Sequence, residues 1–473
     1  MNFAKICRIL AVAVLCLGLS LGACGCQSGT SAVAGTSTNF AASTQSTASL
    51  TVAAESEQSA LISSAGSNAP VHSSVPGTAS RTGSAFASSK VSFKSTSSKA
   101  VSSNLPVQSS RYLKGVWLSC YDIAGLGVKG MNASAFKQKA AAVMKTVRSA
   151  GYNTVFCHVR AFGDAYYPSK YFPFTAAFTG VAGQSPGYDP LAILLQAAKA
   201  NGLAFHAWIN PYRVRLNKNS PKLSKNDPAK KWLDDGSENA CYAGNGIYYN
   251  PGSAAVRQLV LNGVEEILKN YKVDGIHFDD YFYPTTGAEF DQKTYAASGK
   301  KTTLENWRRN NVNILISSTW RLCKRYGVKF GVSPSGHLPN GYNDKNYTQN
   351  YADLKLWLTA AGYVDYLAPQ LYWGYSNPTK AVQYAELLKG WCSLKRAPGV
   401  QLYIGLAGYK IGSTNAADKA DYCSGNLLAR QTKDAAAAGC NGVINFSYGD
   451  LVKIDAAHQS ENKALKLALE QLK

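Results

Sequence analysis

Short apolar runs alternate with longer amphipathic runs from about residue 111 to the end of the chain. A short apolar run predicts a buried strand, and a 3.6-residue period over a longer stretch predicts a helix. The predicted strands are 115–120, 154–160, 204–210, 275–280, 329–334, 366–372, 401–405 and 442–448. The predicted helices between them include 135–150, 190–201, 253–271, 304–326 and 350–361.

This alternation predicts a parallel sheet, because successive parallel strands need a crossover connection that is usually a helix. Eight such repeats fit within one stretch, residues 111–473, whose length suits one large domain. We therefore expect an α/β fold, a closed (β/α)8 TIM-like barrel rather than an open sheet.

The N-terminus resembles a bacterial lipoprotein signal. Lys5 and Arg8 precede an apolar run, 9–17, which is too short for a membrane span and suits a secretory signal. The run leads to Leu21-Gly22-Ala23-Cys24, which resembles a lipobox. We expect a signal peptide over 1–23, lipidation of Cys24, and an extracytoplasmic protein anchored to the membrane by lipid. Cys26 is the alternative acceptor, and an ordinary cleaved signal is the other interpretation.

Residues 24–110 are dominated by Ser, Thr, Ala and Gly and contain few charges. That composition buries too little apolar surface to offset chain entropy, so it predicts a flexible linker. The whole chain carries a net charge of +21. A basic chain suggests nucleic acid, but the predicted export argues against that partner. Anionic wall polymers or an anionic membrane face fit better, and a generally basic surface is the alternative.

Polar and aromatic residues gather where the predicted strands end. The carboxyl ends of barrel strands meet on one face, which carries the active site in this fold. We expect the substrate-binding residues to include His158, Arg160, Asp164, His206, Trp208, Asn210, Arg213, His277, Gln370, Tyr372 and Trp373. Tryptophans suit stacking on sugars, and Arg213 suits a carboxylate such as a muramic lactyl group. For any one of these residues a structural role in the core is the alternative.

Several of these strand ends carry a family resemblance. The stretches are Gly115-Val116-Trp117, 206–213 (HAWINPYR), 273–284 (VDGIHFDDYFYP), 331–336 (GVSPSG) and 365–373 (DYLAPQLYW). In combination they resemble the glycosyl hydrolase-like 10 family across most of 111–450. The resemblance implies a TIM-like barrel and glycosidase activity. It also implies an exported lipoprotein, with peptidoglycan glycan strands among the possible substrates.

Glycoside hydrolysis generally uses two carboxyl groups, and Asp279 and Asp280 are the last two residues of the fourth predicted strand. Adjacent strand residues point to opposite sides, so regular geometry brings only one of them into the pocket. The strand period groups Asp279 with His277, which favours Asp279 as nucleophile or base. If the strand has already ended, Asp280 can turn inward instead. A salt-bridged or loop-capping pair is the structural alternative.

The second carboxylate stays unassigned. The fifth predicted strand ends in Ser333-Pro334-Ser335, where some barrel glycosidases carry a glutamate. The candidates are Asp164, Glu289, Asp291, Asp344 and Asp280 itself.

Two other functions stay open. One is a glycan-binding lipoprotein without catalysis, which the missing acid favours. The other is a metal-dependent wall-polymer deacetylase using His206, His277 and Asp279. No HExxH motif or CxxC spacing occurs in the sequence, so we expect neither a metal nor another cofactor.

Overall fold

The computed structural model describes residues 112–339, 341 and 343–472. Within this part of the chain, eight parallel strands form a closed barrel in the order β1-β11-β10-β9-β8-β7-β3-β2. The strands are β1 (Leu113–Leu118), β2 (Thr154–Arg160), β3 (Ala204–Ile209), β7 (Gly275–Phe278), β8 (Lys329–Val332), β9 (Tyr366–Leu367), β10 (Gln401–Ala407) and β11 (Gly442–Phe446). The predicted TIM-like barrel is confirmed.

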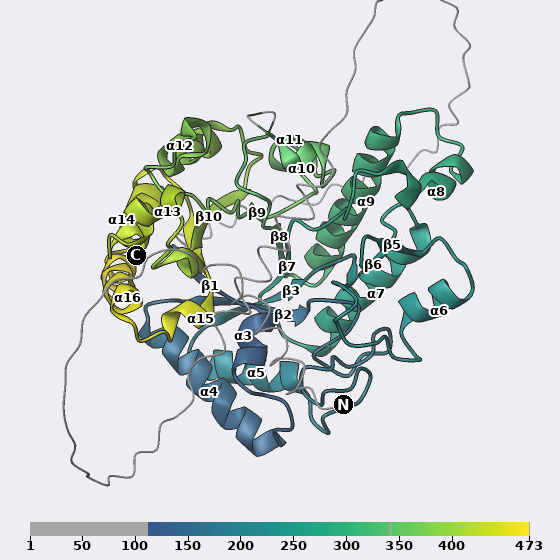
Figure 1. The fold of residues 1–473 in the computed structure, drawn as a ribbon, viewed down its shortest axis with the longest axis horizontal. Coiled ribbons are helices and arrows are strands. Elements are labelled where there is room, and N and C mark those ends of the chain that lie inside the picture. The colour runs from purple at the N-terminus through teal and green to yellow at the C-terminus, as the bar shows by residue number, and fades with distance from the viewer. Residues whose placement is uncertain (1–111, 340, 342, 473) are drawn as a thin grey trace, which may run out of the picture. The chain divides into compact units, whose positions relative to one another are not determined.

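Helices surround the ring of strands (Figure 1). The larger ones are α4 (Ala133–Ser149), α5 (Pro190–Ala200), α7 (Ala254–Asn270), α9 (Leu304–Arg325), α12 (Tyr384–Ser393), α14 (Leu427–Ala437) and α16 (Ala456–Gln471). Shorter ones are α3 (Cys120–Gly125), α6 (Pro228–Asp234), α8 (Gln292–Ala297), α10 (Lys345–Thr348), α11 (Leu354–Thr359), α13 (Ala416–Tyr422) and α15 (Tyr448–Leu451). Three 3₁₀ turns are η1 (Ala288–Phe290), η2 (Lys380–Val382) and η3 (Gly408–Lys410).

The helix boundaries follow local capping chemistry. The side chains of Asn132, Ser253 and Thr303 accept hydrogen bonds from backbone N–H groups in the first turns of α4, α7 and α9. At the other end, Gly151 follows α4 with φ 95° and Gly327 follows α9 with φ 67°. Glycine adopts this left-handed conformation without a Cβ penalty, which explains why the predicted helix ends agree with the structure.

Some strands end earlier than the sequence predicts. β7 stops at Phe278, so Asp279 and Asp280 both lie beyond the strand. β9 contains two residues, and the chain beyond it touches its neighbours through isolated bridges from Gln370 to Ser335 and Gly405. Polar strand ends therefore leave the regular ladder and form the rim of the barrel.

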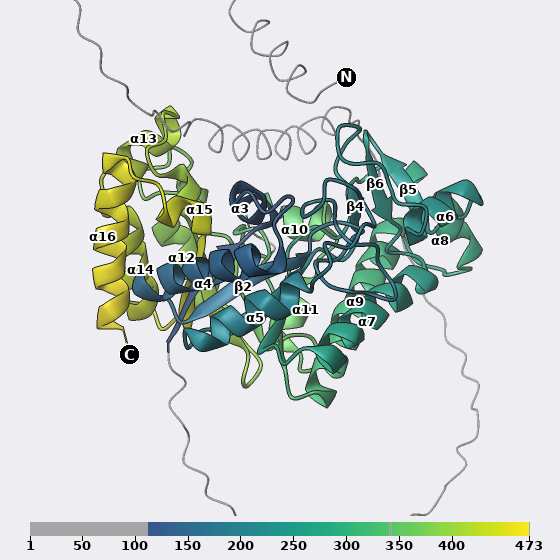
Figure 2. The ribbon, with the colours of Figure 1, turned by 90° about the horizontal axis from the view of Figure 1, so that it is seen from below.

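A small antiparallel sheet is inserted between β3 and α7, and the sequence patterns did not predict it. Its order is β4-β6-β5, with β4 (Arg213–Arg215), β5 (Ala240–Ala243) and β6 (Gly246–Tyr249). Figure 2 shows this sheet beside α6 and α8, at the side of the barrel. β4 follows β3 closely, so the insertion begins at the barrel rim.

Aromatic side chains fill the barrel interior. Trp117, Phe156, Trp208, Tyr366 and Tyr403 belong to one buried cluster, separate from the apolar layer between strands and helices. Glycines on neighbouring strands make room for these rings and for an interior histidine. A Cβ on Gly331 would lie 2.2 Å from the Tyr366 ring, and one on Gly275 would lie 2.3 Å from His206 Nδ1.

The predicted signal peptide, the predicted linker and Cys24 lie outside the described residues. The signal, the linker and the lipidation therefore stay predictions. Among the helices that the structure does describe, we find none that is both long and apolar enough to cross a membrane.

A buried ion pair holds the loop that follows β7. Arg308 on α9 and Asp291 are both fully buried, and the guanidinium Nε lies 3.0 and 3.1 Å from the two carboxylate oxygens. The same guanidinium donates to the carbonyl oxygens of Thr286 at 3.1 Å and Gly287 at 2.7 Å. One side chain therefore fixes the path of the loop that leaves the barrel rim.

Replacing Arg308 with alanine should destabilise the protein by about 3–5 kcal/mol, because it leaves the Asp291 charge buried without its partner. Chemical denaturation followed by tryptophan fluorescence measures this loss. Lys230→Ala is the matched control, because Lys230 forms an exposed ion pair with Asp234 and should contribute under ~1 kcal/mol. Equal losses in the two variants would contradict the role assigned to the buried pair.

Candidate active site

A pocket opens where the carboxyl ends of the barrel strands meet. Its volume is 80 Å³, and its walls come from the ends of most of the strands. The lining residues are Trp117, Ser119, Tyr121, His158, Trp208, Arg213, His277, Asp279, Tyr281, Ser333, Gln370, Tyr372 and Phe446. Seven of these were predicted from the sequence as site residues: His158, Trp208, Arg213, His277, Asp279, Gln370 and Tyr372.

Asp279 lies on the pocket wall with 3% of its surface exposed. The Tyr281 backbone N–H donates a hydrogen bond to its Oδ1 at 3.2 Å. Burial raises the pKa of Asp279 to about 7; the nearby Arg213 charge opposes this rise and the Asp280 charge adds to it. Asp279 is thus a carboxyl group that can hold or release a proton near neutral pH.

Asp280 is half-buried and does not line the pocket. Burial raises its pKa to about 6, while backbone hydrogen bonds, including one from Ser335, and the Arg213 charge act in the opposite direction. Its Oδ1 is buried and finds no hydrogen-bond partner among the described residues. The two adjacent carboxyl groups therefore differ in exposure to the pocket and in acidity.

The positive charge of Arg213 lowers the pKa of both carboxyl groups. Its guanidinium carbon lies 5.0 Å from the centre of the Tyr281 ring and 5.1 Å from that of Phe162. Two rings thus flank the cation, which is 9% exposed, and favour it through cation–π attraction. This residue is the first of β4, so the inserted sheet delivers the charge to the pocket.

His277 forms part of the pocket floor. The Trp117 indole N–H donates to its Nε2 at 3.1 Å, and its Nδ1 lies 3.1 Å from the Tyr366 hydroxyl. An indole N–H can only donate, so Nε2 carries no proton and the ring is neutral. Burial also holds the pKa of His277 well below its usual value. The Tyr366 hydroxyl continues the chain to His206 Nδ1 at 2.9 Å.

His158 supports a tryptophan on the pocket wall. Its Nδ1 accepts the Cys120 backbone N–H at 3.0 Å, and its Nε2 lies 3.2 Å from Asn210 Oδ1. The imidazole stacks on Trp208 with ring centres 3.3 Å apart and planes at 17°. The Trp208 indole N–H is buried and unpaired within the described part of the chain. Trp208 itself lines the pocket, so this buried donor lies close to the pocket wall.

Five predicted binding residues lie away from the pocket wall: Arg160, Asp164, His206, Asn210 and Trp373. Arg160 donates to the Pro211 carbonyl oxygen at 3.0 Å, and Asn210 is the partner of His158. His206 sits deeper in the barrel, bonded to Tyr366.

The other two lie farther out along their loops. Burial raises the pKa of Asp164 to about 6, and the ring of Trp373 packs against His337 with centres 5.1 Å apart.

The sequence reasoning missed several pocket residues. Trp117 lies near the end of β1, Ser119 directly follows it, and Tyr121 lies in the first turn of α3. Tyr281 lies two residues beyond Asp279, Ser333 directly follows β8, and Phe446 ends β11. Each stands at or just after a strand end, so position was the available signal. Serine, tyrosine and phenylalanine are common throughout the chain, so the residue types by themselves did not mark these positions as part of a site.

The remaining acidic candidates do not lie on the pocket wall. Asp291 is paired with Arg308, Asp344 caps α10, and Glu289 lines a different cavity. Across residues 112–339, 341 and 343–472, no cluster of three or more His, Cys, Asp or Glu side chains is arranged to hold a metal ion.

Asp279→Asn should stabilise the protein increasingly as pH rises from 5 to 8. In the unfolded chain the pKa of Asp279 is about 3.9, and in the folded protein it is about 7. Below pH ~3.9 the carboxyl group is protonated in both the folded and the unfolded protein, whereas above pH 7 folding must bury a charged carboxylate. We expect a gain of up to about 4 kcal/mol at pH 8, measured by urea unfolding at several pH values. Asp235→Asn is the control, because Asp235 is exposed and asparagine can also accept the hydrogen bond from the Ser237 backbone N–H. A gain that does not change with pH would contradict the buried-carboxyl assignment.

Comparison with known proteins identifies the family of this chain. The family described as glycosyl hydrolase-like 10 matches residues 112–424. "Glycosyl hydrolase YngK" of Bacillus subtilis (strain 168) is 38% identical over 372 residues, covering 73% of this chain and 70% of the relative. "Glycosyl hydrolase DigH" of Escherichia coli (strain K12) is 34% identical over 333 residues, covering 64% and 75%.

Among solved structures, the glycoside hydrolase domain of PgaB (BpsB) from Bordetella bronchiseptica aligns with a TM-score of 0.50 at 11% identity. The alignment covers 75% of this chain and 99% of that domain, and at this identity it bears on the fold alone. The sequence match extends through the barrel strands up to β10 and includes Asp279 and Arg213. The chain therefore belongs to the glycosyl hydrolase-like 10 family.

Proposed function

We propose that this protein is a glycosidase that hydrolyses a cell-wall or other extracellular glycan, with peptidoglycan glycan strands as the leading candidate substrate. The observation that carries the proposal is Asp279, a buried carboxyl group with a pKa of about 7 on the wall of the rim pocket. The names of the two relatives, both glycosyl hydrolases, support the reaction class.

Asp279 is suited to proton transfer. A carboxyl group whose pKa lies near the working pH can protonate the leaving glycosidic oxygen and afterwards take a proton from water. This role uses the raised pKa of Asp279, whereas a nucleophile is more effective as a stable anion. The strand pattern left Asp279 as nucleophile or base, and the raised pKa supports an acid–base role.

Asp280 is the candidate for the second carboxylate. Its pKa of about 6 leaves it mostly ionised at neutral pH, beside the Arg213 charge. An anion next to the pocket stabilises the positive charge that develops on the sugar ring in the transition state. Because the two groups are neighbours and interact, their protons titrate as a pair.

The pocket wall suits a sugar ring. Trp208 and Tyr372 present aromatic surface, and Gln370 adds a polar amide held by the Ser333 carbonyl oxygen at 3.1 Å. Apolar faces with a few fixed polar groups are the usual composition of small-ligand sites.

The proposed location is the outer face of the cell membrane, through a lipid on Cys24. The lipobox-like sequence and the Ser- and Thr-rich stretch over 24–110 support an anchored enzyme on a long tether. The net charge of +21 favours anionic wall polymers and membrane surfaces as its surroundings. With this address, nucleic acid is not a proposed partner.

A glycan-binding lipoprotein without catalysis is the second candidate. The observation that favours it is the position of Asp280, which leaves Asp279 as the one carboxylate on the pocket wall among the described residues. Glycan binding without any product over long incubation, across a panel of glycans, would favour this alternative.

Asp279→Asn should lower hydrolysis of glycan strands by at least about 100-fold, because the amide cannot transfer the proton. Release of reducing ends measures turnover, and isothermal titration checks that the variant still binds glycan. Asp455→Asn, at the exposed start of α16, should keep full activity. Unchanged turnover in Asp279→Asn would remove Asp279 from the mechanism.

Cys24→Ala should release the protein from the membrane fraction of the producing bacterium, because the lipid acceptor is lost. Immunoblotting of membrane and soluble fractions measures the distribution. Cys26→Ala is the matched control, two residues away, and should stay with the membrane. The opposite result, release by Cys26→Ala alone, would move the lipid to Cys26.

A further inference from the structure

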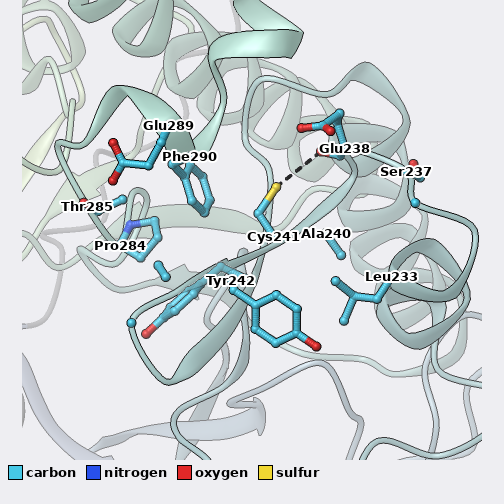
Figure 3. A pocket seen from close by; sticks show the side chains of 14 residues that line it. Leu233, Ser237, Glu238, Ala240, Cys241, Tyr242, Pro284, Thr285, Glu289 and Phe290 are labelled. Atoms are coloured by element: carbon cyan, nitrogen blue, oxygen red, sulfur yellow. Dashed lines mark hydrogen bonds between the residues drawn. The ribbon is translucent and has the colours of Figure 1, made fainter.

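A second and larger cavity, of 680 Å³, lies beside the barrel rim. One wall is the β5–β6 hairpin with the turn after α6, and the other is the loop from Pro284 to Phe290 that follows β7. Figure 3 shows Glu238 and Glu289 on opposite sides of this cavity. It is distinct from the rim pocket that Asp279 lines, which is called the catalytic pocket below, because the two cavities share no lining residue.

The two cavities are separated by a thin wall. In the antiparallel pairing of β4 with β6, Arg213 of the catalytic pocket lies opposite Tyr248 of the larger cavity. In the β7 loop, Tyr281 lines the catalytic pocket and Pro284 lines the larger cavity. Three residues of extended chain span at most ~11 Å, so along this loop the linings of the two cavities lie within about that distance of each other.

The catalytic pocket is too small to hold a polymer by itself. Its 80 Å³ lies well below the ~300–1,000 Å³ usual for ligand sites, whereas the 680 Å³ of the neighbouring cavity lies within that range. A long glycan that places one sugar at Asp279 therefore needs further binding surface, and the larger cavity is adjacent.

The lining of the larger cavity suits sugars. Tyr242 lines this cavity and exposes 66% of its surface, so its ring is open to contact with a ligand. Phe290 and Tyr248 add buried aromatic surface, with exposed fractions of 3% and 9%. Glu238 and Glu289 supply carboxylate oxygens that accept hydrogen bonds from sugar hydroxyl or amide groups.

The current partner of Glu238 does not block this use. Its carboxylate lies 2.9 Å from Lys293 Nζ, but the lysine side chain is 81% exposed. Exposed ion pairs of this kind contribute little free energy, so a bound sugar can displace the lysine at small cost.

The hydrogen bonds that hold the β7 loop in place also suit ligand binding in this cavity. Arg308 holds the Thr286 and Gly287 carbonyl oxygens, and Thr285 and Glu289 on either side line the cavity. The cavity wall is therefore already in place before a ligand arrives, which lowers the entropy cost of binding.

We propose that the cavity between the β5–β6 hairpin and the 284–290 loop is a distal subsite that binds the glycan chain several sugars from the cleaved bond, with Tyr242 as its aromatic platform. This inference rests on the proposed glycosidase function. It makes the enzyme selective for long glycans over short ones.

The test compares glycans of different length. Peptidoglycan glycan fragments of two and of eight sugars are titrated into the full chain carrying Asp279→Asn, with and without Tyr242→Ala. We expect Tyr242→Ala to raise the Kd for the eight-sugar fragment roughly 3- to 10-fold, as the loss of an aromatic contact does, and to leave the disaccharide unaffected. In the catalytically intact background, KM for long fragments should rise while kcat stays constant.

Tyr171→Ala is the matched control, because Tyr171 is also an exposed tyrosine, at 37%, and lines neither cavity. It should change neither Kd. A Glu238→Gln, Glu289→Gln double variant provides a second readout and should also weaken the long fragment selectively.

Three results would decide the matter. Equal Kd values for the long fragment in Tyr242→Ala and Tyr171→Ala, with no effect of the double variant, would overturn the subsite. Equal weakening of short and long fragments would also overturn it, because the cavity would then not be distal. Length-selective binding through Tyr242 by a wild-type protein that forms no product would uphold the subsite while removing the hydrolase proposal.

Discussion

Pairing between the first and last strands closes the barrel, and every functional feature of the rim depends on that closure. Leu113 to Val116 of β1 pair in register with Gly442 to Asn445 of β11. Beyond the strands, the Asp122 carboxylate accepts hydrogen bonds from the Ser447 hydroxyl at 2.9 Å and the Gly449 N–H at 2.8 Å. The closure thus joins residues more than three hundred positions apart and brings Tyr121 and Phe446 to the same pocket.

The closed barrel also determines the electrostatics of the site. Its interior is packed with rings, and the buried histidines among them are held neutral, with the pKa of His206 lowered to about 3 by burial. Asp279 stands at the top of this low-dielectric interior, away from water, so ionising its carboxyl group is costly and its pKa rises. Arg213 limits the rise from one side. The acidity of the site is therefore a balance between the barrel core and one cation from the inserted sheet.

The inserted sheet contributes to both cavities. β4 carries Arg213 to the rim pocket, while β5 and β6 form a wall of the larger cavity. The β7 loop also lines both cavities, because it begins at Asp279 in the rim pocket and reaches Phe290 in the larger cavity. Two elements with different sequence patterns therefore each contribute to both cavities, and the buried Arg308 ties the loop to α9.

The sequence by itself determined the barrel and most of its helices. Apolar runs and capping residues act locally, so the positions of strands such as 154–160 and the glycine after α9 follow from neighbours in the chain. It also identified about half of the pocket wall, because strand ends in this fold share one face.

Tertiary structure alone decided which strand-end residues face the pocket. His206 and Asn210 stand at the same strand end as Trp208, yet one lies in the barrel interior and the other supports His158. The distinction between Asp279 and Asp280 has the same origin, since β7 ends before both and the loop then sets their directions. The charge of Arg213 at the pocket, and the larger cavity beside it, arise from the pairing of β4 with β6. Side-chain direction beyond a strand end and the degree of burial depend on contacts distant in sequence, and no local pattern encodes them.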